Sequence, residues 1–120
     1  MKSYDNCLYV SVHQNKFNDS RIHGAQTFYS PNNIESKNLA NFIQNSISYQ
    51  LQRDNKRNIK IAGTGIFLLY NATKPTVMVE CGFMSNPTEA ALLNDEEYQI
   101  KMSLVILNGL NKYFIAKGDL

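Results

Sequence analysis

A histidine and a glutamate each stand where a predicted β-strand ends. His13 directly follows the strand predicted over Leu8–Val12, and Glu80 ends the strand predicted over Thr76–Glu80. A carboxylate at the end of a mostly apolar run is costly unless a partner or a ligand meets it. In open α/β sheets, ligands bind in the crevice outside the carboxyl ends of the strands, so both side chains could line one site. Each also has a structural interpretation, His13 as a satisfied histidine of the fold and Glu80 as half of an ion pair.

Other reactive residue types lack the spacing that their chemistry needs. Cys7 and Cys81 stand far apart without a C-x-x-C pair, so neither a zinc knuckle nor a disulfide framework is indicated. Cys81 is expected to face the side of the sheet opposite its neighbour Glu80, as a small buried filler. The G-T-G at 63–65 precedes a predicted strand rather than a helix, which makes it a poor phosphate cradle. Nor does any serine stand in a G-x-S-x-G context, so a serine hydrolase is not indicated.

Four short runs rich in β-branched or aromatic residues predict the strands of one sheet. Between the second and third runs, apolar residues at steps of three and four predict a helix with one apolar face. The loop N-A-T-K-P before the last run is too short for a parallel crossover, so the sheet is expected to be mixed. The predicted strands are Leu8–Val12, Ala25–Tyr29, Ile66–Tyr70 and Thr76–Glu80, and the helix is marked by Leu39, Phe42, Ile43, Ile47 and Leu51.

Two helix starts carry capping signals. Asn32, with Glu35 three residues later, is the predicted N-cap of the first helix. For the second helix, Asn86 is the predicted cap, Pro87 suits the first position, and Glu89 falls at the reciprocal capping position. The sequence therefore predicts an α/β layered domain in which helices flank a mixed sheet.

A last helix is predicted from about Asp95 to Phe114. Its apolar arc is wide, which predicts a helix that is largely buried against the sheet. The first strand begins close to Met1, so no upstream element is expected to cover its edge. A complete domain normally covers or blocks such an edge. The arc comprises Ile100, Met102, Leu104, Ile106, Leu107, Leu110 and Phe114.

Bulk properties exclude several classes of partner. A chain of 120 residues is one domain at most, and its net charge of +2 is too weak to indicate a nucleic-acid partner. No stretch reaches the roughly 20 apolar residues of a transmembrane helix. The N-terminal M-K-S-Y-D-N-C-L-Y-V has no signal-peptide core, so the chain is expected to carry no export signal.

Two motifs resemble a known family in the right order and at a suitable separation. S-V-H-Q-N at 11–15 and V-E-C-G-F-M-S-N at 79–86 are similar to motifs of the zinc-dependent N-acetylmuramoyl-L-alanine amidases. H-G-A-Q-T-F-Y-S-P at 23–31 and the run at 74–95 extend the similarity over about residues 5–115. The variant V-E-C-G-F-M-S-N most resembles the spore-cortex and germination branch. The resemblance implies an amidase/phosphorylase-like layered fold.

The resemblance also implies a reaction and a site. These enzymes cut the amide between the muramyl lactyl group and the first alanine of the peptidoglycan stem peptide. Carried over, His13 is a Zn²⁺ ligand and Glu80 is the general base and acid acting on zinc-bound water. Asn15 is assigned to the metal pocket or to substrate binding. Family membership implies a place outside the cytoplasmic membrane, in the cell wall or spore envelope.

One part of the family pattern is missing. The family's other zinc ligands, a histidine in a D-P-G-H-G-G-like strand end and a glutamate on the next helix, lie upstream of the S-x-H-x-N motif. Residues 1–12 contain neither, so 1–120 is expected to be a single partial amidase domain that lacks the first strands and helix. A missing N-terminal half or a partner chain would supply these ligands. Substitution from within this chain, by His23 or Asp19, is the less favoured alternative. The alternative is an inactive remnant that serves as a cell-wall or partner-binding module.

Overall fold

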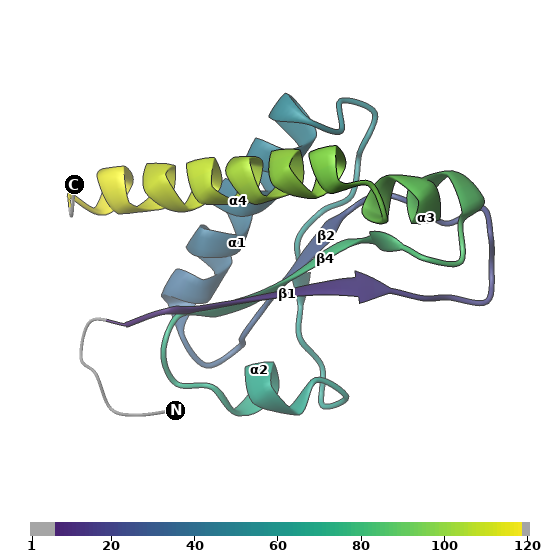
Figure 1. Cartoon of the computed structure of the whole chain (residues 1–120). Helices are drawn as coiled ribbons and strands as arrows, with labels where there is room; N and C mark the ends of the chain where they lie inside the picture. The colour runs from purple at the N-terminus through teal and green to yellow at the C-terminus, as the bar shows by residue number, and fades with distance from the viewer. Residues whose placement is uncertain (1–6, 119–120) are drawn as a thin grey trace.

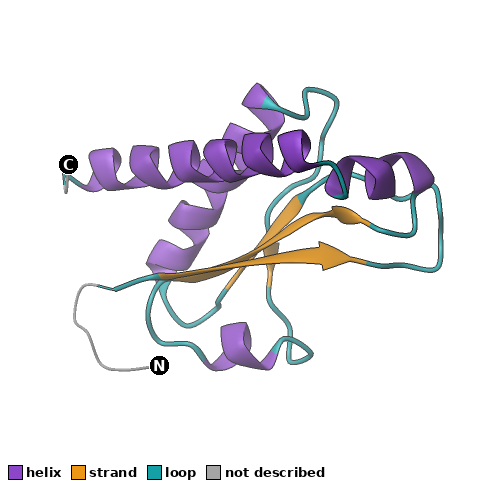
Figure 2. Cartoon of the chain, in the orientation of Figure 1, coloured by secondary structure: helices purple, strands orange, loops and turns teal. Residues whose placement is uncertain are grey.

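The structure is a computed structural model that describes residues 7–118. It is a mixed sheet with helices on both faces, and the strand order is β1-β4-β2-β3 (Figures 1 and 2). Strand β4 pairs parallel with β1 and antiparallel with β2, while β2 pairs parallel with β3. This confirms the predicted mixed α/β fold. The elements are β1 (Tyr9–Asn15), β2 (Gln26–Tyr29), α1 (Ile34–Gln50), β3 (Lys60–Ile61), α2 (Phe67–Asn71), β4 (Thr76–Phe83), α3 (Pro87–Leu93) and α4 (Glu96–Lys117).

The central strand β4 is buried along its whole length because helices pack on both faces of it. Its alternating side chains divide the core. Val77, Val79 and Cys81 pack in the main cluster with α1 and α4. On the other face, Met78 packs with Leu69 of α2 in a smaller cluster.

The predicted strand over Ile66–Tyr70 is wrong, because this segment forms helix α2. An apolar run of this length does not show by periodicity whether it is a strand or a helix. Only Leu69 of α2 is buried, whereas Phe67 and Leu68 are largely exposed. The strand on this side of β2 is instead the short β3, which the sequence analysis did not identify.

The predicted cap of α1 is displaced by one residue. Asn33 is the N-cap, and its Oδ1 accepts the backbone N–H of Glu35 at 2.9 Å. Asn32 instead donates its side-chain amide to the carbonyl oxygen of Ala72 at 2.9 Å. The cap of α3 is confirmed, since Asn86 Oδ1 accepts the N–H of Glu89 at 3.0 Å.

Helix α4 is less buried than its apolar arc predicts. Met102 and Ile106 are in the core, but Ile100, Leu104 and Leu107 are 54%, 54% and 48% exposed. Strand β1 lies at one edge of the sheet and pairs with β4 alone among the described strands. Within residues 7–118, no helix combines the length and the apolar character needed to cross a bilayer.

Candidate active site on β1 and β4

His13 and Glu80 lie side by side on neighbouring strands. The parallel register of β1 and β4 pairs His13 with Glu80, so the two side chains share one face of the sheet. Both strands run beyond the predicted ends, to Asn15 and Phe83, which places the pair inside the strands near their carboxyl ends. His13 is exposed, and its Nε2 lies 2.8 Å from the hydroxyl oxygen of Ser11.

Glu80 is a buried carboxylate that the described residues do not satisfy. Its side chain is 9% exposed, and its Oε2 has no hydrogen-bond partner among residues 7–118. Burial raises the pKa of Glu80 above its ordinary value, and the nearby charge of His13 acts in the opposite direction. A carboxyl group whose pKa is raised in this way binds a proton more readily than an exposed glutamate does, which suits it to general acid–base chemistry.

Cys81 occupies the opposite face of β4, as predicted. Its side chain is 5% exposed and packs in the main core. Burial raises the pKa of the thiol to about 11, and the charge of Glu80 adds to the effect. Because the thiolate is the nucleophilic form, this cysteine is a packing residue rather than a reactive group.

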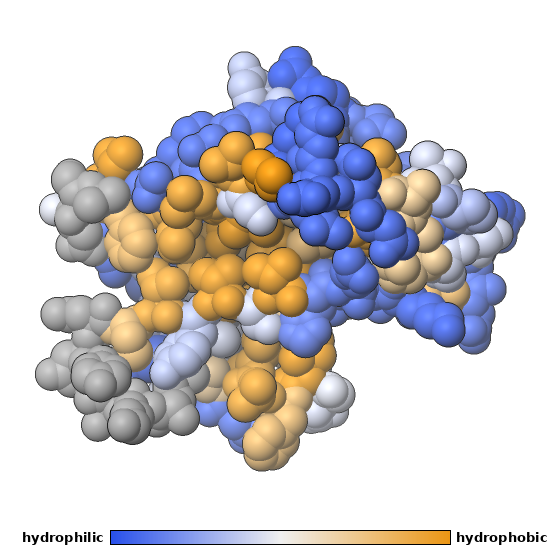
Figure 3. All heavy atoms as spheres, viewed as in Figure 1, coloured by the Kyte–Doolittle hydropathy of each residue, from blue (hydrophilic) through white to orange (hydrophobic). Residues whose placement is uncertain are grey.

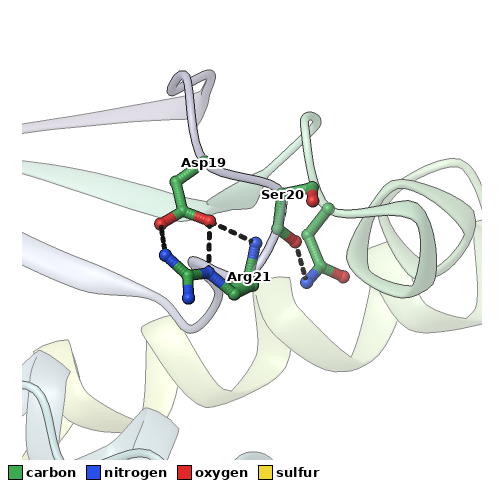
Figure 4. Close-up of polar contacts among 4 residues, drawn as sticks. Asp19, Ser20 and Arg21 are labelled. Carbon is green, nitrogen blue, oxygen red and sulfur yellow. Dashed lines mark hydrogen bonds and ion pairs between the residues drawn. The ribbon is translucent and has the colours of Figure 1, made fainter.

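The loop at 16–24, which follows β1, is fastened to the turn between β4 and α3. Ser85 Oγ accepts the backbone N–H of Phe17 at 3.0 Å. The side-chain amide of Asn86 donates to the carbonyl oxygen of Ser20 at 2.8 Å (Figure 4). Residues of the V-E-C-G-F-M-S-N motif therefore hold the loop that begins three residues after His13.

Glu89 completes this attachment in a way that the sequence analysis missed. Its buried carboxylate accepts the N–H of Gly24 at 2.9 and 3.0 Å and the N–H of Phe83 at 2.7 Å. The predicted reciprocal cap is thus wrong, because the N–H of Asn86 bonds to the Phe83 carbonyl oxygen instead. A Cβ on Gly82 would lie 2.6 Å from Glu89 Oε1, so the glycine makes room for this carboxylate.

Asp19 and His23 do not join His13 in a metal site. Asp19 binds Arg21 through an ion pair of 2.8 Å, and this partner lowers the pKa of the aspartate (Figure 4). His23 is exposed and lines an open cavity of about 700 Å³ together with Gly24 and Arg57. Within residues 7–118, no three His, Cys, Asp or Glu side chains gather as metal ligands.

Asn15 lies at the irregular end of the β1–β4 pairing. Its backbone carbonyl oxygen accepts the N–H of Met84 at 2.8 Å, and its side-chain Oδ1 accepts the N–H of Lys16 at 2.7 Å. These bonds shape the end of β1 next to His13. The assignment of Asn15 to substrate binding stays a prediction.

The fold and both motifs agree with a single family. The sequence model of the Amidase_3 family of N-acetylmuramoyl-L-alanine amidases matches residues 1–112. The chain belongs to this amidase family. The predicted family resemblance is therefore confirmed at the level of family and fold.

Several amidases are similar to this chain. The germination-specific N-acetylmuramoyl-L-alanine amidase of Bacillus subtilis (strain 168) is 38% identical over 112 residues, which are 93% of this chain and 46% of that protein. The CwlD amidase of Clostridioides difficile, solved in complex with the GerS lipoprotein, has a TM-score of 0.87 at 39% identity, covering 93% of this chain and 57% of that one. The amidase AmiC2 of Nostoc punctiforme has a TM-score of 0.79 at 26% identity, and the match covers 89% of this chain and 57% of that one. The chain thus spans about half the length of these relatives.

Proposed function

We propose that this chain carries the catalytic carboxylate of an enzyme that hydrolyses the N-acetylmuramoyl–L-alanine amide of peptidoglycan. The observation that carries the proposal is Glu80, a buried carboxylate beside His13 with one oxygen that has no hydrogen-bond partner within residues 7–118. A carboxylate without a partner is costly, and catalysis is one reason to retain it. Membership of the amidase family supports the same reaction.

In the proposed reaction, Glu80 is the general base and then the general acid. The carboxylate takes a proton from the attacking water, and the water oxygen bonds to the amide carbonyl carbon. When the C–N bond breaks, the carboxylic acid returns that proton to the leaving nitrogen. The products are the lactyl carboxylic acid and the free amino group of L-alanine, so atoms and charge balance.

The Zn²⁺ implied by the family is only partly provided for by the described residues. His13 is the proposed ligand, and a catalytic zinc site needs three protein ligands. Since residues 7–118 bring no such group together, they do not fit a complete site, and we assign no step to the metal. The remaining donors would come from another polypeptide segment, such as a missing N-terminal half or a partner chain.

Peptidoglycan as the substrate places the proposed action outside the cytoplasmic membrane, in the cell wall or spore envelope. Asn15, beside His13 at the end of β1, is proposed to contact substrate or to shape the metal pocket. No nucleic-acid partner is proposed. The GerS lipoprotein in the CwlD structure suggests that a protein partner is also worth testing here.

A second candidate function is a binding module without hydrolytic activity. The incomplete donor set favours it, because His13 is the one proposed ligand within residues 7–118, and a single ligand does not hold a catalytic metal firmly. In that case residues 7–118 would retain the amidase scaffold for binding cell wall or a protein partner.

A digestion experiment distinguishes the two candidate functions. The purified chain would be incubated with peptidoglycan and Zn²⁺, and stem peptides with new N-terminal alanine would be measured by mass spectrometry. For amidase activity we expect Glu80→Gln to lower release by about 100-fold or more, the range that one general acid–base group contributes. Glu97→Gln, on the exposed face of α4, is the matched control and should leave release unchanged.

Equal release by the wild type and Glu80→Gln would overturn the catalytic role of Glu80. Pelleting of the chain with peptidoglycan, without release of stem peptides, would favour the binding module.

A further inference from the structure

Gln26 of β2 lies directly beside Glu80, on the side away from His13. The antiparallel register of β2 and β4 pairs Gln26 with Glu80, and the parallel register of β1 and β4 pairs His13 with Glu80. Residues directly opposite each other on neighbouring antiparallel strands share a face, with Cβ atoms about 4.5–5.5 Å apart. We call His13, Glu80 and Gln26 the polar row. His13 is exposed and Gln26 is partly exposed, so the row reaches the surface at both ends.

The polar row lies beside an apolar cluster on the same face of the sheet. Two residues away along the strands, Phe28 pairs with Met78, and both pack with Leu69 of α2. Figure 3 shows apolar side chains gathered over α2 at the bottom of the view and hydrophilic ones near the carboxyl end of β1. Gln26 does not belong to the α2 cluster. Packing of that cluster therefore does not explain a glutamine at this position.

The backbone on both sides of Gln26 is held by side-chain amides from α1 and the turn after it. Gln52 Oε1 accepts the N–H of Ala25 at 2.9 Å, and Gln44 Oε1 accepts the N–H of Thr27 at 2.8 Å. The amide of Gln44 also donates to the carbonyl oxygen of Ala25 at 3.0 Å. Ala25 and Thr27 are fully buried on the α1 side. Because side chains alternate along a strand, this arrangement fixes the side chain of Gln26 on the face of Glu80.

The carboxamide of Gln26 is anchored through its nitrogen and leaves its oxygen available. Its Nε2 donates to the carbonyl oxygen of Asn58 at 2.9 Å. Its Oε1 accepts no hydrogen bond from residues 7–118. A carboxamide oxygen is an acceptor only, so the group that it would bind is an N–H or O–H donor. Since the side chain is already anchored, little further ordering is needed when it binds such a donor.

We infer that Gln26 positions the substrate by accepting a hydrogen bond from the peptide N–H that follows the first alanine of the stem peptide. The inference rests on the proposed function, which brings the scissile amide to Glu80. Consecutive Cα atoms of a peptide are about 3.8 Å apart, so the next peptide unit comes within reach of a residue directly beside Glu80. Gln26 would thus favour muramoyl peptides of two or more residues, and it takes no part in proton transfer.

The test measures binding to the full chain by NMR titration. The probe is N-acetylmuramoyl-L-alanyl-D-isoglutamine, which contains the scissile amide and one further peptide bond. Its analogue carries a methyl group on the nitrogen of that further bond and so lacks the N–H. We expect wild type to bind the analogue about tenfold more weakly than the probe, because the acceptor oxygen loses its donor.

Two variants assign this difference to a residue. Gln26→Met keeps the length of the side chain but lacks the acceptor oxygen, so it should bind the probe and the analogue equally well. Gln50→Met is the matched control, because Gln50 is an exposed glutamine at the end of α1, on the other face of the sheet. This control should prefer the probe about tenfold, as wild type does.

Two results would overturn the inference. One is a Gln26→Met variant that still prefers the probe over the analogue as strongly as wild type does. The other is a folded wild type, recognised by its dispersed amide spectrum, in which the probe shifts no amide of the polar row. Mass spectrometry would verify that the probe stays intact, so hydrolysis is not a readout. Equal release from peptidoglycan by wild type and Glu80→Gln would instead count against the proposed function alone.

Discussion

Glu80 shows how the sequence can nominate a residue whose energetic state depends on the fold. Its apolar neighbours and its motif identify it as a carboxylate with a role. The structure adds that one of its oxygens is buried without a partner in the described residues and that burial raises its pKa. Both effects follow from burial by neighbours distant in sequence, whereas the charge of His13 on β1 opposes the rise in pKa.

The raised pKa of Glu80 predicts that the difference in unfolding free energy between wild type and Glu80→Gln changes with pH. Because the folded protein holds the Glu80 proton more tightly than the unfolded chain, the free energy of unfolding falls as pH rises from the ordinary pKa of 4.5 through the raised value. Glu80→Gln removes this ionisation. The variant should therefore gain stability relative to wild type as pH rises through that window, with no gain below it.

Urea unfolding from about pH 4 to pH 8 measures this difference, with Glu97→Gln as the exposed control. If the stability difference between wild type and Glu80→Gln were constant over this range, the pKa of Glu80 would not be raised.

At the scale of elements, the crossing of α1 and α4 depends on Gly109. A Cβ at this position would lie 2.8 Å from the Cα of Ile43 and 2.8 Å from the carbonyl oxygen of Phe42. Both atoms belong to the backbone of α1, so a rotamer change cannot move them away. The glycine therefore sets how closely the two helices approach, and α1 in turn packs on β4.

Gly109→Ala tests this contact, because two effects oppose each other. Alanine favours a helix interior over glycine by about 1 kcal/mol. Overpacking against the α1 backbone costs about 1–3 kcal/mol, so we expect net destabilisation of up to about 2 kcal/mol. Gly63→Ala, where a Cβ meets nothing within 4 Å, is the control. A higher melting temperature for Gly109→Ala than for wild type would show that the helices can separate at little cost.

At the scale of the whole molecule, the described residues form a sheet with β1 at one edge, and they gather no group of three metal donors. His13 lies on the strand that forms this edge. The proposed ligand therefore stands on an edge strand of the described sheet.

Zinc content tests the donor set directly. We expect well below one Zn²⁺ per chain after exhaustive dialysis, because residues 7–118 gather fewer than three ligands. Elemental analysis of wild type and His13→Ala gives the answer. A ratio near one that falls in His13→Ala would mean that further donors of this chain reach the site.

The sequence alone determined what depends on local pattern. Short runs of β-branched and aromatic residues predicted β1, β2 and β4. Steps of three and four predicted α1, and Asn86 and Asp95 marked the starts of α3 and α4. Two motifs identified the family and nominated His13 and Glu80. These signals are readable because periodicity, capping and motif spacing act within a few residues.

Only the tertiary structure decided features that depend on contacts between distant segments. It made Phe67–Asn71 a helix where a strand was predicted, and it left Ile100, Leu104 and Leu107 of α4 about half exposed. It also turned Glu89 from a local cap into an acceptor for the N–H groups of Gly24 and Phe83. The physical reason is common to all three. An apolar run, a carboxylate or an amphipathic face is compatible with several arrangements, and the neighbours that fold against it select one.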